Sequence, residues 1–527
     1  MDRIKEIKRR RTFAIISHPD AGKTTLTEKL LLFGGAIRVA GAVKSNKIKK
    51  TATSDFMEIE RQRGISVATS VMGFEYGDHK INILDTPGHK DFAEDTFRTL
   101  TAADSVIVVI DVAKGVEEQT ERLVEVCKMR KIPMMFFINK LDRPGKDAFE
   151  LLDEIELKLS CKVTPLSWPI GMGIDFKGVY NKYEGKLDIF DRNSQVVNDE
   201  GASISVESTD DKIFDDKLGD IAEKFRGEYE LISGVYEEFD RSEYLDGNIC
   251  PVFFGSALNN FGVRDLLNCF TDIAPHPQPV ESDIKEIIPE DEKFSGFVFK
   301  IHANIDPNHR SRIAFVKIVS GMFERNKNYY HTKLDRNFKF SNPTSFMASK
   351  KEIVEEAFPG DIVGIPDTGN FKIGDTLTEG EKFNFTGIPN FAPETFQYIE
   401  NADPLKSKQL NKGIVQLTDE GVAQLFIRTA NNKKIIGTVG NLQFEVIKYR
   451  LEHEYSALSR FEPLSLYRAC WITCDDPKKL KEFKDKNHFF IAEDKRGNPV
   501  FLAETSWSLQ RAQEKFPDVK FHFKSEF

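Results

Sequence analysis

The stretch SHPDAGKTT, at residues 17–25, contains the residue types that bind phosphate groups. Glycine lets a backbone approach an anion closely, and the N–H groups at a helix N-terminus point toward its oxygens. Lys23 can neutralise β- and γ-phosphates, Thr24 can offer a hydroxyl to Mg²⁺, and Thr25 can reach an α-phosphate. Ser17 stands where the pattern G-x-x-x-x-G-K-[ST] begins with glycine, and an ordinary strand–turn–helix corner is the alternative reading. The candidate phosphate-binding residues are Ser17, His18, Pro19, Asp20, Ala21, Gly22, Lys23, Thr24 and Thr25.

A second motif, DTPGH at residues 85–89, contains a carboxylate followed by a tight turn. Asp85 can hold the hydration shell of Mg²⁺, and the N–H of Gly88 can sense a γ-phosphate. By itself the motif is equally typical of a routine Pro-Gly turn. Its candidate nucleotide-binding residues are Asp85, Thr86, Pro87 and Gly88.

A third motif, NKLD at residues 139–142, indicates which base is bound. Guanine presents an N1–H and a 2-amino group on one edge, and the carboxylate of Asp142 can accept from both. Adenine offers neither donor and would leave that carboxylate unpaired. Asn139 can bond another edge of guanine, the stem of Lys140 can lie along the ring, and GSA at 255–257 can direct N–H groups at O6. The candidate base-binding residues are Asn139, Lys140, Leu141, Asp142, Ser256 and Ala257.

These motifs depend on strands and helices that bring them together. The first 145 residues contain the apolar runs FAIIS, KINILD, SVIVVIDV and PMMFFINK, separated by helix-like segments, and PVFFGSAL follows at 251–258. Continuous apolar runs alternating with helices predict a parallel sheet covered on both faces. Ligands bind at the carboxyl ends of such strands, and the motifs follow these runs in order. The sequence therefore predicts a GTP site.

The predicted fold class is multidomain α/β, because 527 residues exceed a single core. Residues 1–275 are expected to form a P-loop GTPase domain with an α-rich, partly irregular insertion at about 146–250. Residues 276–388 contain short alternating segments and predict an antiparallel β-barrel domain. Residues 389–527 predict an α+β domain, with strands at GIVQLT, AQLFIRT and IIGTVG and a helix at NLQFEVIKYRLEHEY.

The composition excludes several classes of protein. The chain is 40% hydrophobic and 30% charged, which suits globular domains, and no apolar run approaches the roughly 20 residues needed to span a bilayer. The net charge of −9 argues against a generally basic nucleic-acid binder. The run KSNKIKK at 44–50 is either a local basic face or a solvated loop. Six scattered cysteines predict free thiols in a reducing cytosol.

The segments SHPDAGKTT, RQRGISV, DTPGHKDF, NKLDRPG and GSA together resemble the translational GTPases, most closely their bacterial peptide chain release factor three branch. The resemblance covers almost the whole chain, since PGDIVGI and IGDTL are similar to the barrel domain of that family. It implies that His89 is the catalytic residue and aligns the attacking water, where Ras-type GTPases use a glutamine. It also implies that Mg²⁺ is held by Thr24, Ser66 and Asp85, with Ser66 in place of the usual threonine.

The resemblance implies a cytoplasmic, monomeric enzyme that hydrolyses GTP to GDP and phosphate with Mg²⁺. Its partners would be the ribosome, through ribosomal RNA and proteins, and class I release factors, without membrane or DNA. It would promote dissociation of class I release factors after peptide release, without codon specificity. The absence of a GGQ tripeptide agrees with a factor that does not itself cleave peptidyl-tRNA.

Three alternatives remain open. An elongation-factor-G-like translocase or ribosomal protection GTPase is expected to continue beyond a third domain, whereas this chain ends at Phe527. A metabolic GTPase subunit, such as the one that serves sulfate adenylyltransferase, is expected to end in a second barrel, whereas residues 441–455 have a helical pattern. A scaffold that binds GTP without hydrolysing it would leave His89 without a role.

Overall fold

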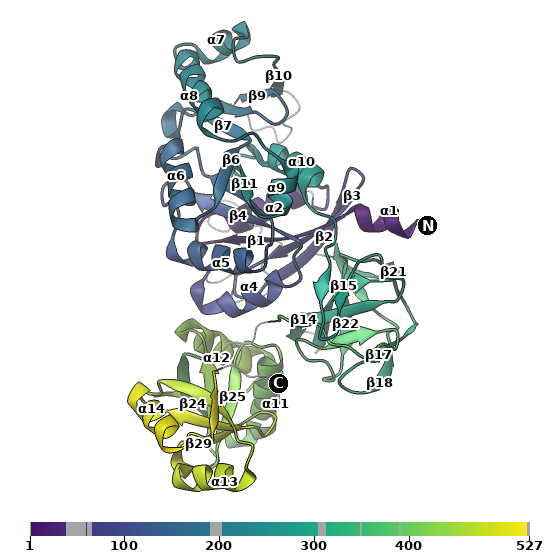
Figure 1. Ribbon diagram of the computed structural model, residues 1–527, viewed down its shortest axis with the longest axis vertical. Helices are drawn as coiled ribbons and strands as arrows, with labels where there is room; N and C mark the ends of the chain where they lie inside the picture. The colour runs from purple at the N-terminus through teal and green to yellow at the C-terminus, as the bar shows by residue number, and fades with distance from the viewer. Residues whose placement is uncertain are drawn as a thin grey trace.

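The structure is a computed structural model that describes residues 2–37, 60, 66–189, 203–303, 312–347, 350–388 and 392–523. Figure 1 shows an N-terminal α/β domain, a β-rich domain beside it and a C-terminal α+β domain below both. The predicted fold class is confirmed. Among the described residues, no helix is long and apolar enough to cross a bilayer. The basic run at 44–50 lies outside the described residues.

A mixed sheet forms the centre of the N-terminal domain, with strands in the order β2-β3-β1-β4-β5-β11-β6. Strand β2 is antiparallel to β3, and the other neighbours are parallel. The carboxyl ends of β1, β3 and β5 therefore lie along one edge of the sheet, where the motifs SHPDAGKTT, DTPGH and NKLD begin. The bounds are β1 Arg10–Ser17, β2 Ser70–Tyr76, β3 His79–Asp85, β4 Ser105–Asp111, β5 Met134–Asn139, β6 Lys162–Pro165 and β11 Ile249–Phe254.

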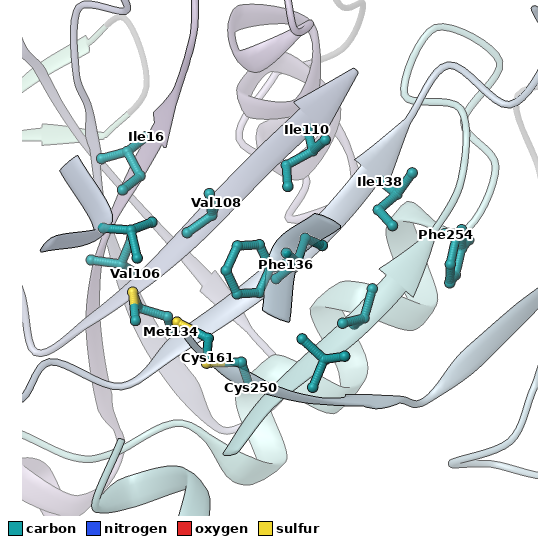
Figure 2. Packing of buried hydrophobic residues seen from close by; sticks show 14 of the residues in the cluster. Ile16, Val106, Val108, Ile110, Met134, Phe136, Ile138, Cys161, Cys250 and Phe254 are labelled. Carbon is teal, nitrogen blue, oxygen red and sulfur yellow. The ribbon is translucent and has the colours of Figure 1, made fainter. Parts of the chain in front are cut away.

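Helices cover both faces of this sheet, as predicted. Successive residues of β1 alternate between two hydrophobic cores: Phe13 packs with α2 and α10, and Ala14 packs with α5 and α6. Figure 2 shows the second core, where Val108 and Phe136 of neighbouring strands lie together. Apolar side chains on both faces explain why these strands have continuous apolar sequences. The helices are α1 Arg3–Lys8, α2 Lys23–Phe33, α4 Ala93–Leu100, α5 Glu118–Met129, α6 Ala148–Leu159 and α10 Val263–Ile273.

The segment predicted as an insertion at about 146–250 differs from its prediction in two respects. Helix α6 and strand β6 belong to the main domain, since β6 pairs with β11 at the edge of the sheet. The remainder contains a four-stranded antiparallel sheet as well as helices. Its strands have only three or four residues, too few to give a clear period in the sequence. The elements are β7 Ser167–Ile170, β8 Gly178–Asn181, β9 Lys186–Ile189, β10 Ser203–Ser205, α7 Lys212–Leu218, α8 Ile221–Val235 and α9 Arg241–Leu245.

The second domain is an antiparallel β structure that joins the first sheet directly. Strand β19 lies beside β2, with Met347 paired to Gly73, so one sheet continues from domain to domain. A buried apolar core fills its interior. A hairpin of β12 Val280–Glu281 and β13 Glu286–Ile287 comes first. The strands that follow are β14 Ser295–Ala303, β15 Arg312–Ser320, β16 Phe323–Glu324, β17 Asn328–His331, β18 Arg336–Lys339, β19 Thr344–Met347, β20 Lys350–Ile353, β21 Glu356–Ala357, β22 Ile362–Asp367 and β23 Thr376–Thr378.

The C-terminal domain is α+β, with an eight-stranded sheet. The predicted helix at 441–455 is confirmed as α12 Asn441–Tyr455, and AQLFIRT and IIGTVG form β25 and β26. The predicted strand GIVQLT is wrong, because it lies in α11 Ser407–Asp419, whose buried residues face α12. The other elements are β24 Thr395–Asn401, β25 Gln424–Arg428, β26 Lys434–Thr438, β27 Ser459–Leu464, β28 Arg468–Thr473, β29 Ile491–Asp494, β30 Pro499–Ala503, β31 Lys520–His522, α13 Pro477–Lys486 and α14 Ser506–Lys515.

Candidate functional site

The loop between β1 and α2 has the backbone geometry of an anion-binding turn. Ser17 is the last residue of β1 and pairs with Val109 in extended conformation, so this position does not need glycine. The left-handed conformations fall instead on Asp20, with φ of 69°, and on Gly22, with φ of 95°. A Cβ atom on Gly22 would lie 2.3 Å from Nδ2 of Asn139. Glycine is therefore required at the second glycine position of the motif, Gly22, and not at the first, which Ser17 occupies.

The N-terminus of α2 presents its first-turn N–H groups without a side-chain cap. Gly22 occupies the N-cap position and makes no side-chain hydrogen bond. Such N–H groups, together with the helix dipole, favour an anion at this end of the helix. Lys23 begins the helix and is buried, while Thr24 and Thr25 are half-buried beside it.

The end of β3 brings the second motif against this loop. The ammonium of Lys23 contacts the carboxylate of Asp85, which is 1% exposed. The other carboxylate oxygen of Asp85, Oδ2, has no hydrogen-bond partner among the described residues. Thr86 donates to the carbonyl of Ile15 at 2.7 Å and fixes the turn to β1. A buried, unpartnered carboxylate oxygen next to a phosphate loop fits a hydrated divalent cation.

Gly88 packs directly on the phosphate loop, because a Cβ atom there would lie 3.3 Å from the carbonyl oxygen of Ser17. Ser66 is half-buried and precedes β2, whose first residue, Ser70, lies opposite Asp85. The role of Ser66 as a third Mg²⁺ ligand stays a prediction.

Asn139 connects the phosphate loop to the base-binding motifs. Its Nδ2 donates to the carbonyl of Ala21 at 2.8 Å. Its Oδ1 accepts from the N–H of Ala257 at 2.9 Å and from the N–H of Lys140 at 2.9 Å. The amide group therefore holds three chain segments together, and one amide hydrogen remains for a ligand.

Asp142 is placed as a partly exposed acceptor at the same corner. Its Oδ1 accepts from the hydroxyl of Ser256 at 2.6 Å, and its side chain is 19% exposed. The N–H of Leu141 donates to the carbonyl of Gly255 at 3.2 Å, which joins NKLD to GSA. The structure thus brings together all the predicted base-binding residues.

Lys140 has a partner that the sequence analysis did not single out. Its ammonium donates to Asp111 at 2.7 Å and contacts the carbonyl of Asp20. Burial alone would raise the pKa of Asp111, but the hydrogen bonds from Lys140 and from the N–H of Ala113 hold it below its ordinary value. Asp111 ends β4, so its position on the shared sheet edge is the signal that could have found it.

His89 begins the short helix that follows the second motif. Its side chain is 33% exposed, and its Nδ1 accepts from the N–H of Asp91 at 3.1 Å. In the neutral ring the proton then lies on Nε2, which has no partner among the described residues. His89 can therefore orient a water at the open side of the site.

His18 differs from the other loop residues because its ring is buried. Its Nε2 lies 3.5 Å from Oε2 of Glu117. Burial lowers the pKa of His18, so the ring is neutral at pH 7.

The segment that follows His89 is held by the C-terminal domain. Asp91 accepts from the N–H of Leu442, in the first turn of α12, at 2.7 Å. Phe92 packs in an apolar cluster with Val67 and Val446 of α12. The sequence analysis missed these contacts because no local pattern identifies a contact between domains.

Family models match three stretches of the chain. Residues 8–276 match the elongation factor Tu GTP binding domain, 293–380 match elongation factor G domain 2, and 385–513 match the class II release factor RF3, C-terminal domain. Among solved structures, the crystal structure of a protein from Thermus thermophilus is similar over 89% of this chain and 71% of its own, with a TM-score of 0.70 and 21% identity. This likeness concerns the fold.

Proposed function

The chain belongs to the translational GTPases, and from this we propose that it is a ribosome-dependent GTPase that promotes dissociation of class I release factors after peptide release. In this proposal it reads no codon. The match of residues 385–513 to the C-terminal domain of class II release factor RF3 is the observation that carries the choice of this role.

GTP is the substrate that the site fits. Lys23 and the N–H groups that begin α2 would bind the phosphates, and Asp142 would accept from N1–H and the 2-amino group of guanine. Asn139 would keep the two halves of the site in register through its bonds to Ala21 and Ala257.

Thr24, Ser66 and Asp85 would hold Mg²⁺ beside the bound phosphates. The charge of the ion would offset that of the phosphate oxygens. Lys23, which already contacts Asp85, would supply a second positive charge. His89 would orient the attacking water through Nε2, rather than act as a strong base.

The testing experiment measures GTP turnover by the full chain with and without ribosomes, and then displacement of a labelled class I release factor from post-release ribosomes. We expect stimulated turnover together with displacement. Turnover that ribosomes do not stimulate would contradict the proposal.

A translocase-like role is the second candidate, favoured by the match of residues 293–380 to elongation factor G domain 2. Ribosome-stimulated turnover without displacement of the release factor would support this second role.

A further inference from the structure

A polar cavity of about 440 Å³ lies where the three domains meet, away from the nucleotide site. Figure 1 shows α4 and β14 above α11 and α12 at this junction. The cationic residues that line the cavity are Arg98 of α4, Lys333 and Lys372 of the second domain, and Lys495 and Arg496 of the C-terminal domain. Cavities of this size bind small organic molecules.

The charges on these walls are not balanced. Arg98 is neutralised by Glu94, Lys333 by Asp375 at 3.2 Å, and Lys495 by Asp419. By contrast, the ammonium of Lys372 and the guanidinium of Arg496 make no hydrogen bond or ion pair with any described residue.

The acidic residue beside Arg496, Asp494, makes no ion pair with it among the described residues. The carboxylate of Asp494 accepts from the indole N–H of Trp471 at 3.0 Å and from the side-chain amide of Asn498 at 2.9 Å. It also accepts from the backbone N–H groups of Arg496 and Asn498. These neutral donors occupy the oxygens of Asp494, so its charge offsets that of Arg496 only through space, and Arg496 is exposed at the edge of the cavity.

Cations near the cavity contribute to the lowered pKa of one lining residue, Lys495. The pKa of Lys495 is lowered by burial, despite its ion pair with Asp419, and the charges of Arg312 and Lys372 lower it further. An anion in the cavity would relieve this repulsion.

The cavity also has an apolar side. Phe385 and Ile388 of the second domain lie on it, opposite Leu425 and Phe426 of β25 and Trp471 of β28. Apolar and aromatic walls combined with a few charged groups are typical of sites for ligands with a flat apolar body and a charged end.

We propose that this cavity is a binding site for a small organic anion with two negative charges and a flat apolar body. The charged end lies between Lys372 and Arg496, so the ligand bridges the second and C-terminal domains. Arg98 connects it to α4, the helix that follows the His89 segment. The bound anion therefore fixes the relative positions of the three domains.

The test uses 1-naphthyl phosphate as the probe, with the full chain saturated with GDP so that the nucleotide site is occupied. Calorimetric titration is expected to give saturable, one-site binding. Lys372→Ala with Arg496→Ala is expected to weaken it by about tenfold or more, as loss of two charged contacts predicts. Lys372→Arg with Arg496→Lys, which keeps both charges, is expected to retain binding within about threefold.

A matched control replaces two exposed cations that do not line the cavity, Lys478→Ala with Arg460→Ala, and is expected to bind as the parent chain does. Neutral 1-naphthol and inorganic phosphate each lack one half of the ligand, and both are expected to bind at least about tenfold more weakly than 1-naphthyl phosphate. Absence of saturation to about 1 mM probe would overturn the proposal. Equal binding by the Lys372/Arg496 double alanine variant, or by 1-naphthol, would also overturn it.

Discussion

At the scale of single residues, the two histidines of the candidate nucleotide site, His18 and His89, have opposite surroundings. His18 is buried and neutral beside Glu117, whereas His89 is a third exposed, with Nδ1 bound to the backbone. Only His89 combines a fixed ring with an open nitrogen, which is what the orientation of a water requires.

Replacing His89 by alanine tests this assignment. We expect His89→Ala to keep its GTP and GDP affinities and to lose ribosome-stimulated turnover by about 100-fold or more, because positioning of the water is lost. Nucleotide binding is measured by equilibrium titration and turnover by phosphate release. The exposed His488→Ala serves as the control. A comparable loss of nucleotide affinity would instead assign His89 a structural role.

In our proposal, Asp142 determines which base the site binds. Asp142→Asn exchanges an acceptor for a donor toward the base, so we expect preference to shift from guanine to xanthine nucleotides by about tenfold or more. Competition binding with GDP and xanthosine diphosphate measures the shift. Asp147→Asn, which changes a helix cap five residues away, is expected to leave base preference unchanged. Unchanged guanine selectivity in Asp142→Asn would refute the assigned contact.

At the scale of elements, α12 is bound at its N-terminus by a residue from another domain. Asp91 accepts from the N–H of Leu442, and Gly440 allows this approach, since a Cβ there would lie 2.1 Å from Cγ of Asp91. The acidic side chain meets the positive end of the helix dipole. The contact links the His89 segment to the C-terminal domain.

Asp91→Ala is expected to weaken this contact by about 0.5–2 kcal/mol, the usual cost of losing a helix N-cap. Hydrogen exchange at the N–H of Leu442 is expected to quicken. Asp476→Ala, which removes the cap of α13 within the C-terminal domain, is expected to leave exchange at Leu442 as it is. Exchange at Leu442 as slow as in the parent chain would contradict a role for Asp91 in linking the domains.

The elements also show what the sequence could and could not predict. The buried parallel strands were predicted because their apolar runs are continuous, and α12 was predicted because its sequence has a helical pattern. The segment GIVQLT was mistaken for a strand, since the buried positions Gly413, Ile414 and Leu417 become a helical face only when α12 packs on them. The motifs could be predicted to lie together in one candidate site because each follows a strand of the sheet. The Asp111–Lys140 and Asp91–Leu442 contacts depend on tertiary packing, which no local pattern encodes.

At the scale of the molecule, a buried carboxylate joins the first two domains. Asp361 lies 2.8 Å from Nε of Arg10 and 3.0 Å from Nζ of Lys80. Burial alone would raise its pKa, but the charges of Lys80 and Arg10 outweigh burial and hold the pKa of Asp361 well below its ordinary value.

Because the folded-state pKa is lowered, the stability contributed by Asp361 is complete above the unfolded value of about 4 and is lost as the pH falls further. Asp361→Asn is expected to cost about 3–5 kcal/mol near pH 7, because Arg10 stays buried with one carboxylate fewer. Thermal unfolding midpoints at about pH 7, 4 and 2.5 are expected to show a difference between parent and variant that is nearly constant down to about pH 4 and narrows at the lowest pH. The exposed Asp335→Asn is the control. A difference in unfolding midpoint that stays constant at all three pH values would show that the charge of Asp361 does not stabilise the interface.

The pairing of β19 with β2 has a consequence for synthesis of the chain. Gly73 meets Met347 only after roughly 270 further residues have been made, which at roughly 5–20 residues per second takes on the order of 15–55 s. Throughout that interval β2 is paired only with β3 and its other edge is open, and such edges recruit strands from other chains. The N-terminal domain is thus most prone to aggregate while the second domain is still emerging, so a truncated chain ending before β19 would retain this hazard permanently.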